Sequence, residues 1–306
     1  MLGANFFLEE EMKNTIFKGV ATALVTPMTE KGIDYENFGR LVDWQIEQGI
    51  NALVVCGTTG EASTLTDEEH KDLIKYCVER VNKRVPVIAG TGGNDTAYSI
   101  GLSQYACSVG ADACLCVTPY YNKATQKGLV KMFTEIADNI DKPIILYNVP
   151  SRTGVNIEPQ TYLELADHKN ISAIKEANGD ISKAVKTMSL VGDKLDMYCG
   201  NDDQVIPFMS IGGSGVISVL SNILPAETVK MCDLFFKGKV AESAQMQLKY
   251  KALIDALFCE VNPIPAKAGV SAMGFGENYL RSPLTQMEEG NKEKLLKLMR
   301  EQGLKV

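Results

Sequence analysis

The sequence predicts a (β/α)8 barrel (class α/β, TIM barrel) with a C-terminal helical extension. Eight short apolar runs recur about 20–35 residues apart, which is the length of one strand–helix repeat. Each run is nearly continuous in apolar residues, as is typical of parallel strands covered by helices. The runs begin at Val20, Ala52, Val85, Ala113, Pro143, Ile171, Leu195 and Gly215.

Helix signals occupy the stretches between the runs. Thr66 and Glu69 form a capping box, because the threonine hydroxyl and the glutamate can each satisfy a free N–H group. A second helix is expected over 34–48, and Glu158-Pro159 opens a third, since proline is tolerated in a first turn. A doubly wound open sheet is the alternative fold. We prefer the barrel because no Gly-x-Gly-x-x-Gly turn follows the first run.

The strand-like runs stop at about residue 224. Helices are expected over 225–236, 240–258 and 292–300, and the Asn262-Pro-Ile-Pro265 segment predicts a rigid turn between them. The predicted organisation is an N-terminal extension over 1–15, a barrel over 16–224 and a helical domain over 225–306.

The composition excludes several classes of function. With 31 basic and 38 acidic residues the net charge is −7, so a nucleic acid or an anionic membrane is a poor partner. A histidine-rich metal site or a Ser–His–Asp triad would depend on His70 and His168, the two histidines. The eight cysteines form no Cys-x-x-Cys pair, and no metal site is expected. Cys114 and Cys116 are predicted to be buried thiols on one face of a strand.

We expect no export signal at the N-terminus, because Phe6-Phe7-Leu8 is short and three glutamates follow it. A reducing cytoplasm is the expected location. Residues 1–11 are either native or an extension that precedes a native start at Met12, and the sequence leaves both open.

Lys175 is the most informative candidate residue. Active sites of such barrels lie at the C-terminal ends of the strands, and Lys175 follows the apolar residues 171–174. Burial disfavours an ammonium ion, and a neutral amine can form a Schiff base with a carbonyl substrate. The alternatives are an ion pair with Glu176 or a solvated lysine at a strand end.

Other polar residues follow neighbouring runs. Tyr147 is either a proton carrier or a core aromatic residue, and Arg152 is either a carboxylate ligand or part of a surface salt bridge. The turn Gly57-Thr58-Thr59-Gly60 offers N–H groups and hydroxyls to a carboxylate or a phosphate, or is merely a turn. The glycines of 212–215 precede the last run, which favours close packing over phosphate binding.

In their order and spacing, the segments 57–61, 147–154 and 174–176 resemble the dihydrodipicolinate synthase family of pyruvate aldolases. The resemblance extends from about Phe17 to the C-terminus. It includes Thr26-Pro27, Thr118-Pro-Tyr-Tyr121, Gly215-Val-Ile-Ser-Val219 and Asn262-Pro-Ile-Pro-Ala-Lys267. It implies a lyase that condenses pyruvate with L-aspartate 4-semialdehyde, the first committed step of diaminopimelate and lysine synthesis.

The resemblance also implies roles for individual residues. Lys175 would form the Schiff base with pyruvate, without any other cofactor. Tyr147 would relay protons, and Thr58 would link it to Tyr121, which such enzymes insert into a neighbouring subunit's site. A homo-oligomer, at least a dimer and typically a tetramer built as a dimer of dimers, is therefore expected.

The remaining implied residues bind the substrates. Thr59 would bind the pyruvate carboxylate, and Arg152 would orient the carboxylate of the semialdehyde. The backbone of Gly200 and Ile217 would line the pocket.

Two alternatives remain. One is a related pyruvate-dependent aldolase such as N-acetylneuraminate lyase or a keto-deoxy-sugar-acid aldolase, against which Thr59 and Arg152 argue. The other is a barrel that binds a keto acid without turning it over.

The residues that would form a lysine feedback site match only in part. Asn94, Tyr120 and His70 match the site of lysine-sensitive members, whereas Asp67 and Tyr98 stand where those members usually carry His and Glu. We expect weak or absent inhibition by lysine.

Overall fold

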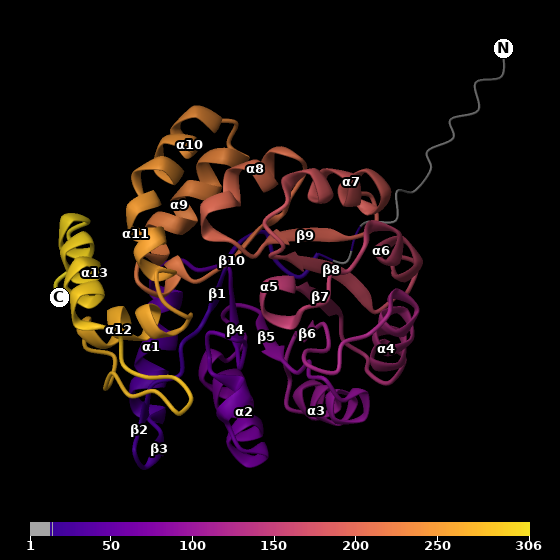
Figure 1. Ribbon diagram of the computed structural model, residues 1–306, viewed down its shortest axis with the longest axis horizontal. Helices are drawn as coiled ribbons and strands as arrows, with labels where there is room; N and C mark the ends of the chain where they lie inside the picture. The colour runs from indigo at the N-terminus through magenta and orange to yellow at the C-terminus, as the bar shows by residue number, and fades with distance from the viewer. Residues whose placement is uncertain (1–12, 14) are drawn as a thin grey trace.

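Eight parallel strands close into a barrel in this computed structural model, which describes Lys13 and residues 15–306 (Figure 1). The order around the barrel is β1-β10-β9-β8-β7-β6-β5-β4. Each predicted apolar run supplies one strand, so the barrel prediction is confirmed and the doubly wound alternative is wrong. The strands are β1 (Gly19–Ala23), β4 (Ala52–Val55), β5 (Val87–Gly90), β6 (Ala113–Val117), β7 (Ile144–Asn148), β8 (Ile171–Glu176), β9 (Asp196–Cys199) and β10 (Gly215–Ser218).

Helices cover the outside of the barrel and begin where the sequence places their caps. Both hydrogen bonds of the Thr66–Glu69 capping box are present at the start of α2, and Asp34 caps α1. The outer helices are α1 (Tyr35–Glu47), α2 (Asp67–Val81), α3 (Thr96–Ser108), α4 (Gln126–Asp138), α6 (Pro159–Leu165), α7 (Ile181–Val191) and α8 (Val205–Ser210). No sequence pattern predicted the short hairpin β2 (Met28–Thr29) and β3 (Gly32–Ile33) or the one-turn helix α5 (Pro150–Thr153).

The barrel interior is a separate apolar cluster from the layer between strands and helices. It consists largely of alanines and β-branched residues, with Tyr147 and Tyr198 among them. Phe17 precedes β1 and stacks on Tyr198, with ring centroids 4.1 Å apart, at the end where the strands begin. Aromatic stacking thus closes part of that end of the barrel interior.

Close packing explains the glycine at the start of β10. A Cβ on Gly215 would lie 1.8 Å from the carbonyl oxygen of Gly19. The φ of Gly215 is +141°, a conformation that residues other than glycine rarely adopt. The expectation of close packing is confirmed at this position.

Cys114 and Cys116 are fully buried in β6, between the sheet and the helices. Burial raises the pKa of Cys116 to about 12, so its thiol stays protonated at neutral pH. Their prediction as buried thiols on one face of a strand is confirmed.

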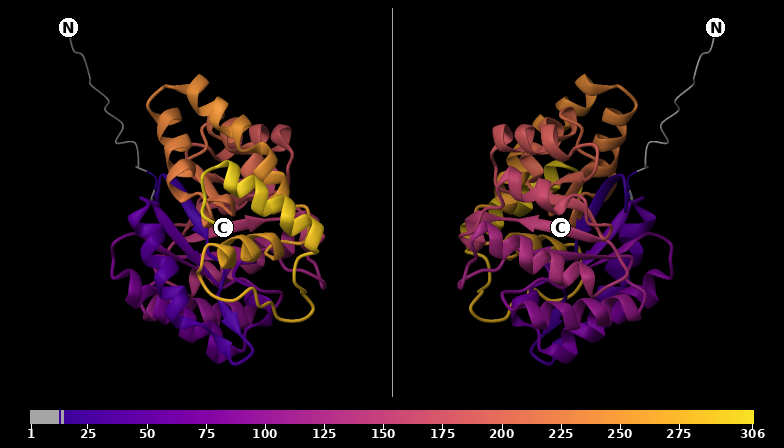
Figure 2. Two further views of the ribbon diagram at one scale, coloured as in Figure 1. Left: turned by 90° about the vertical axis from the view of Figure 1, so that its left-hand side faces the viewer. Right: turned by 90° about the vertical axis from the view of Figure 1, so that its right-hand side faces the viewer.

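The C-terminal region is helical, but its elements differ from the expected ones (Figures 1 and 2). Helix α9 (Pro225–Phe236) has the predicted bounds, and α13 (Glu289–Glu301) begins earlier than predicted. The single helix expected over 240–258 is wrong, because α10 (Val240–Lys249) and α11 (Lys251–Leu257) are separate. Helix α10 packs on α9 whereas α11 packs on α13, so tertiary contacts divide a pattern that looked continuous.

The predicted rigid turn over 262–265 is only partly correct. A cis peptide bond joins Asn262 to Pro263, and helix α12 (Ile264–Ala272) begins directly after it. Pro265 is compatible with a helix because it lies in the first turn, where its missing N–H group has no partner to lose. The division into domains at residue 224 stays a prediction.

Among the described residues, no helix is long and apolar enough to cross a membrane. Residues 1–11, for which the sequence left a native segment and an added extension both open, and most of the predicted extension over 1–15 lie outside the described residues.

Candidate active site

Lys175 and Tyr147 lie side by side inside the barrel. The register of β7 and β8 pairs the two residues, and the Lys175 Nζ is 4.3 Å from the centre of the Tyr147 ring. Only 6% of Lys175 and 7% of Tyr147 is exposed. The predicted alternative of a Lys175–Glu176 ion pair is wrong, since Glu176 is hydrogen-bonded to Asn148 and Tyr162 in the layer outside the barrel.

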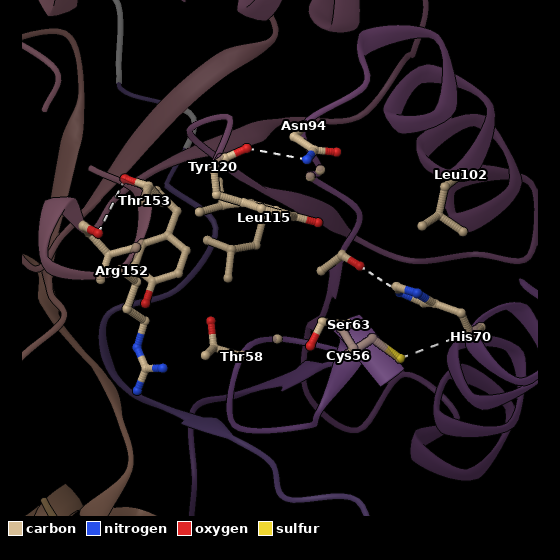
Figure 3. A pocket seen from close by; sticks show the side chains of 18 of the residues that line it. Cys56, Thr58, Ser63, His70, Asn94, Leu102, Leu115, Tyr120, Arg152 and Thr153 are labelled. Carbon is tan, nitrogen blue, oxygen red and sulfur yellow. Dashed lines mark hydrogen bonds between the residues drawn. The ribbon is translucent and has the colours of Figure 1, made fainter. Parts of the chain in front are cut away.

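A cavity of about 570 Å³ opens at the C-terminal ends of β4, β5, β6 and β7 (Figure 3). The side chains of Thr58 and Arg152 both face it, and Tyr147 is part of its wall. Three residues that the sequence analysis selected separately therefore share one space. Lys175 is not among the residues that line this cavity, and its Nζ lies over the face of the Tyr147 ring.

Asn262 joins the two predicted carboxylate-binding residues. Its side-chain amide donates a 3.0 Å hydrogen bond to the hydroxyl of buried Thr59, and its carbonyl oxygen accepts one of 3.2 Å from the Arg152 guanidinium. Arg152 thus contacts a backbone oxygen rather than forming the predicted surface salt bridge. Asn262 belongs to one of the family motifs in the sequence, but no role was expected for it.

A buried ion pair holds the turn that contains Thr58 and Thr59. The Lys267 ammonium, from α12, donates to the Glu61 carboxylate and, at 2.7 Å, to the carbonyl oxygen of Tyr279. The Arg281 backbone N–H group donates to the second carboxylate oxygen of Glu61 at 3.2 Å. Both ion-pair side chains are at most 2% exposed. Sequence reasoning missed this link between the turn and the C-terminal helices.

Gly200 and Ile217 lie at the other side of the barrel mouth. The Gly200 N–H group donates to the Glu176 carbonyl oxygen at 2.7 Å, and a Cβ on Gly200 would lie 2.7 Å from the Ala177 Cβ. Ile217 is buried in the interior cluster that contains Tyr147. The glycine is therefore required by packing, and its backbone is close to the end of β8.

Tyr121 does not join the cavity wall of its own chain. Its side chain is 94% exposed, and its φ of +70° is in the left-handed region that non-glycine residues rarely adopt. An exposed aromatic side chain on an unfavourable backbone conformation is a feature that typically serves function rather than stability.

Another part of the cavity wall is formed by His70, Asn94, Tyr98 and Tyr120, four of the residues compared with a lysine site. The Tyr98 hydroxyl donates a 2.8 Å hydrogen bond to the Asp67 carboxylate. Burial and then Asp67 raise the pKa of Tyr98 to about 12, so the phenol stays neutral. His70 bonds the Gly90 carbonyl oxygen at 2.8 Å, and burial lowers its pKa. Asp67 thus already has a partner within the chain.

The described part of the chain contains no group of three or more His, Cys, Asp or Glu side chains arranged to hold a metal ion. The side chains brought together at the candidate site carry an amine, hydroxyls, an amide and a guanidinium.

A closed eight-stranded barrel with polar side chains gathered at the C-terminal ends of its strands is the arrangement typical of (β/α)8-barrel enzymes. The model of the dihydrodipicolinate synthetase family matches residues 16–302, and the chain belongs to this family. The resemblance found in the sequence is confirmed.

Named relatives are similar over nearly the whole chain. A 4-hydroxy-tetrahydrodipicolinate synthase of Clostridium perfringens (strain 13 / Type A) is 55% identical, over 90% of this chain and 95% of its own. The dihydrodipicolinate synthase of Acinetobacter baumannii, solved in complex with pyruvate, is 41% identical, with a TM-score of 0.92 over 95% of this chain and 100% of its own. A monomeric dihydrodipicolinate synthase variant is 44% identical, with a TM-score of 0.93 over 94% of this chain and 98% of its own.

Proposed function

We propose that this enzyme condenses pyruvate with L-aspartate 4-semialdehyde through a Schiff base on Lys175. The chain is a lyase of the 4-hydroxy-tetrahydrodipicolinate synthase type, acting in diaminopimelate and lysine biosynthesis. The observation that carries the assignment to Lys175 is its position, buried in the barrel with its Nζ 4.3 Å from the Tyr147 ring.

The chemistry begins with attack of the unprotonated Lys175 amine on the ketone carbon of pyruvate. Proton transfer to the carbinolamine oxygen allows water to leave and an iminium ion to form. The iminium withdraws electrons, so a methyl proton is lost and an enamine results. The enamine carbon attacks the aldehyde, and the substrate's amino group then attacks the imine carbon, closes the ring and releases Lys175. Tyr147, whose ring centre lies 4.3 Å from the Lys175 Nζ, is suited to carry these protons.

The carboxylates of the two substrates bind at separate places. Thr59 offers a hydroxyl and the N–H groups of its turn to pyruvate, and the Arg152 guanidinium suits the carboxylate of the semialdehyde. The backbone of Gly200 and Ile217 forms the opposite wall. No cofactor is needed, because the covalent bond to Lys175 supplies the electron sink.

The exposed Tyr121 supports an oligomer. We propose a relay of Tyr147, Thr58 and a Tyr121 from a neighbouring subunit, which requires at least a dimer and fits a tetramer built as a dimer of dimers. Thr58 and Tyr147 already share the cavity, and Tyr121 projects from its own chain. The cytoplasm is the proposed location.

Trapping the Schiff base tests the proposal. Incubation with pyruvate and borohydride, followed by peptide mass spectrometry, should place a reduced adduct on Lys175. The variant Lys175→Arg should lose the adduct and the exposed-residue control Lys186→Arg should keep it. An unmodified Lys175 would contradict the proposal and favour a barrel that only binds keto acids.

A substrate assay separates the related aldolases. Aspartate semialdehyde should be turned over with pyruvate, whereas N-acetylmannosamine should not. Turnover of the amino sugar alone would favour an N-acetylneuraminate lyase.

A further inference from the structure

Two pairs of residues end the neighbouring strands β7 and β8. Tyr147 pairs with Lys175 inside the barrel, and one position further along Asn148 pairs with Glu176. Successive side chains of a strand point to opposite faces, so the second pair lies in the layer between strands and helices. Asn148 is fully buried and Glu176 is 1% exposed.

The outer pair is densely hydrogen-bonded. The Asn148 Nδ2 donates to both oxygens of Glu176, at 2.9 and 3.1 Å. The Tyr162 hydroxyl from α6 donates at 3.0 Å, and the Asn178 backbone N–H group donates at 2.9 Å. The Asn148 Oδ1 accepts from the Ile157 N–H group at 3.1 Å. The cluster therefore joins β7, β8, α6 and the segment that follows β8.

The backbone of the same residues extends these links. The Ala177 N–H group donates to the Asn148 carbonyl oxygen at 2.9 Å, and Gly200 donates to that of Glu176 at 2.7 Å. Backbone bonds keep the strands adjacent, but they leave rotation at the strand ends weakly restrained. A side-chain bond between residues 148 and 176 restrains that rotation.

We propose that Asn148 and Glu176 are positioning residues, whose mutual hydrogen bonds orient the ends of β7 and β8 so that the Lys175 amine stays against Tyr147. This inference rests on the proposed function of Lys175 and Tyr147. A rotation that moved Glu176 on the outer face would move Lys175 on the inner face in the opposite direction. A displacement of about 1 Å of a reacting group can lower a rate about a hundredfold.

The cluster is matched to a carboxylate. Its four hydrogen bonds to Glu176 all come from uncharged donors of Asn148, Tyr162 and Asn178. Burial raises the pKa of Glu176 to about 7, and the hydrogen bonds oppose the rise. An amide at position 176 would place an N–H group against these donors, because glutamine has only one acceptor oxygen.

The experiment measures the rate of pyruvate trapping by borohydride, together with kcat and KM, in the full-length enzyme. Glu176→Gln should lower the trapping rate and kcat by about tenfold or more, while KM for pyruvate changes by less than about twofold. The reciprocal swap combines Asn148→Asp with Glu176→Gln, so that an amide at position 176 donates to a carboxylate at position 148. This double variant should recover most of the rate. A swap that recovers thermal stability but not the rate would overturn the proposal, as would a wild-type rate in Glu176→Gln.

A matched control removes a buried carboxylate at the other end of the barrel. Asp196 begins β9, is 4% exposed and accepts a 2.7 Å bond from Ser214. Asp196→Asn should lower stability without lowering the trapping rate per folded molecule. An equal loss in both variants would mean that position 176 is only structural.

Tyr162→Phe covers the case in which Glu176→Gln does not fold. It removes one hydrogen bond and should lower the trapping rate several-fold, and an unchanged rate would contradict the proposal. The wild-type protein separates this inference from the proposed function. If wild type forms no pyruvate adduct, the proposed function fails, whereas an adduct that forms equally well in every variant overturns only the positioning role.

Discussion

The side-chain amide of Asn262 donates a 3.0 Å hydrogen bond to the Thr59 hydroxyl, across 203 positions of sequence. The carbonyl oxygen of the same asparagine accepts a bond from Arg152. One residue from the C-terminal region therefore contacts both proposed carboxylate-binding side chains, and it fixes their spacing relative to each other.

Asn262→Ala should lower kcat/KM for both substrates by about tenfold, because loss of one hydrogen bond of about 1–1.5 kcal/mol frees Thr59 to rotate. Steady-state kinetics with each substrate varied in turn measures the effect. The neighbouring exposed residue provides a control, Val261→Ala, which should behave as wild type. Unchanged kinetics in Asn262→Ala would show that Thr59 needs no support from the C-terminal region.

Tyr121→Phe should lower kcat about a hundredfold or more, the usual contribution of a proton-transfer group, and leave pyruvate trapping intact. If Tyr121 acts in a partner's site, co-expressed Tyr121→Phe and Lys175→Ala chains should complement each other. Random pairing gives mixed dimers in half of the population, each with one intact site of two, hence about a quarter of wild-type activity. The control Tyr105→Phe on α3 should be fully active. An inactive mixture would place Tyr121 outside its neighbour's site.

L-Lysine should inhibit the enzyme weakly or not at all. The Tyr98 hydroxyl donates a hydrogen bond to the Asp67 carboxylate. Position 98, where sensitive relatives usually carry Glu, therefore presents a neutral phenol instead of a carboxylate. Initial rates across a lysine titration measure this, and an inhibition constant from the low micromolar to the sub-millimolar range would contradict it. The double variant Asp67→His with Tyr98→Glu should gain sensitivity, because it restores an anionic partner for the lysine ammonium.

Stability should depend on pH through Glu176. Burial raises its pKa from 4.5 to about 7 in the folded chain, so the folded state holds the proton more tightly than the unfolded state. The contribution of protonated Glu176 to the free energy of unfolding is complete below about pH 4.5. It falls as the pH rises through 7, by up to about 3 kcal/mol. Urea unfolding at pH 5 and pH 8 should show a smaller pH difference for Glu176→Gln than for wild type. The exposed control Glu164→Gln, on the neighbouring helix α6, should keep the wild-type difference, and an equal difference in all three proteins would contradict the assignment.

The barrel was predictable because its strands are local apolar runs, each of which carries its own signal. The division of 240–258 into two helices was not, because it depends on which helices α10 and α11 pack against. Lys175 could be selected because a cation is unusual after an apolar strand. The same rule suggested Glu176 as its ion-pair partner, whereas the alternation of the strand turns the two side chains to opposite faces. The roles of Asn262 and Lys267 depend on contacts across more than 200 residues, which no local pattern records.

The ion pair of Lys267 with Glu61 has a consequence for the order in which the protein becomes active. The turn after β4 is among the earlier parts of the chain to be synthesised, yet the groups that fix it come from residues 267, 279 and 281. A nascent chain whose eight strands have all left the ribosome would therefore still lack a formed substrate turn. Catalytic competence would arise only after residue 281 is available, so activity depends on the C-terminal region as well as on the barrel.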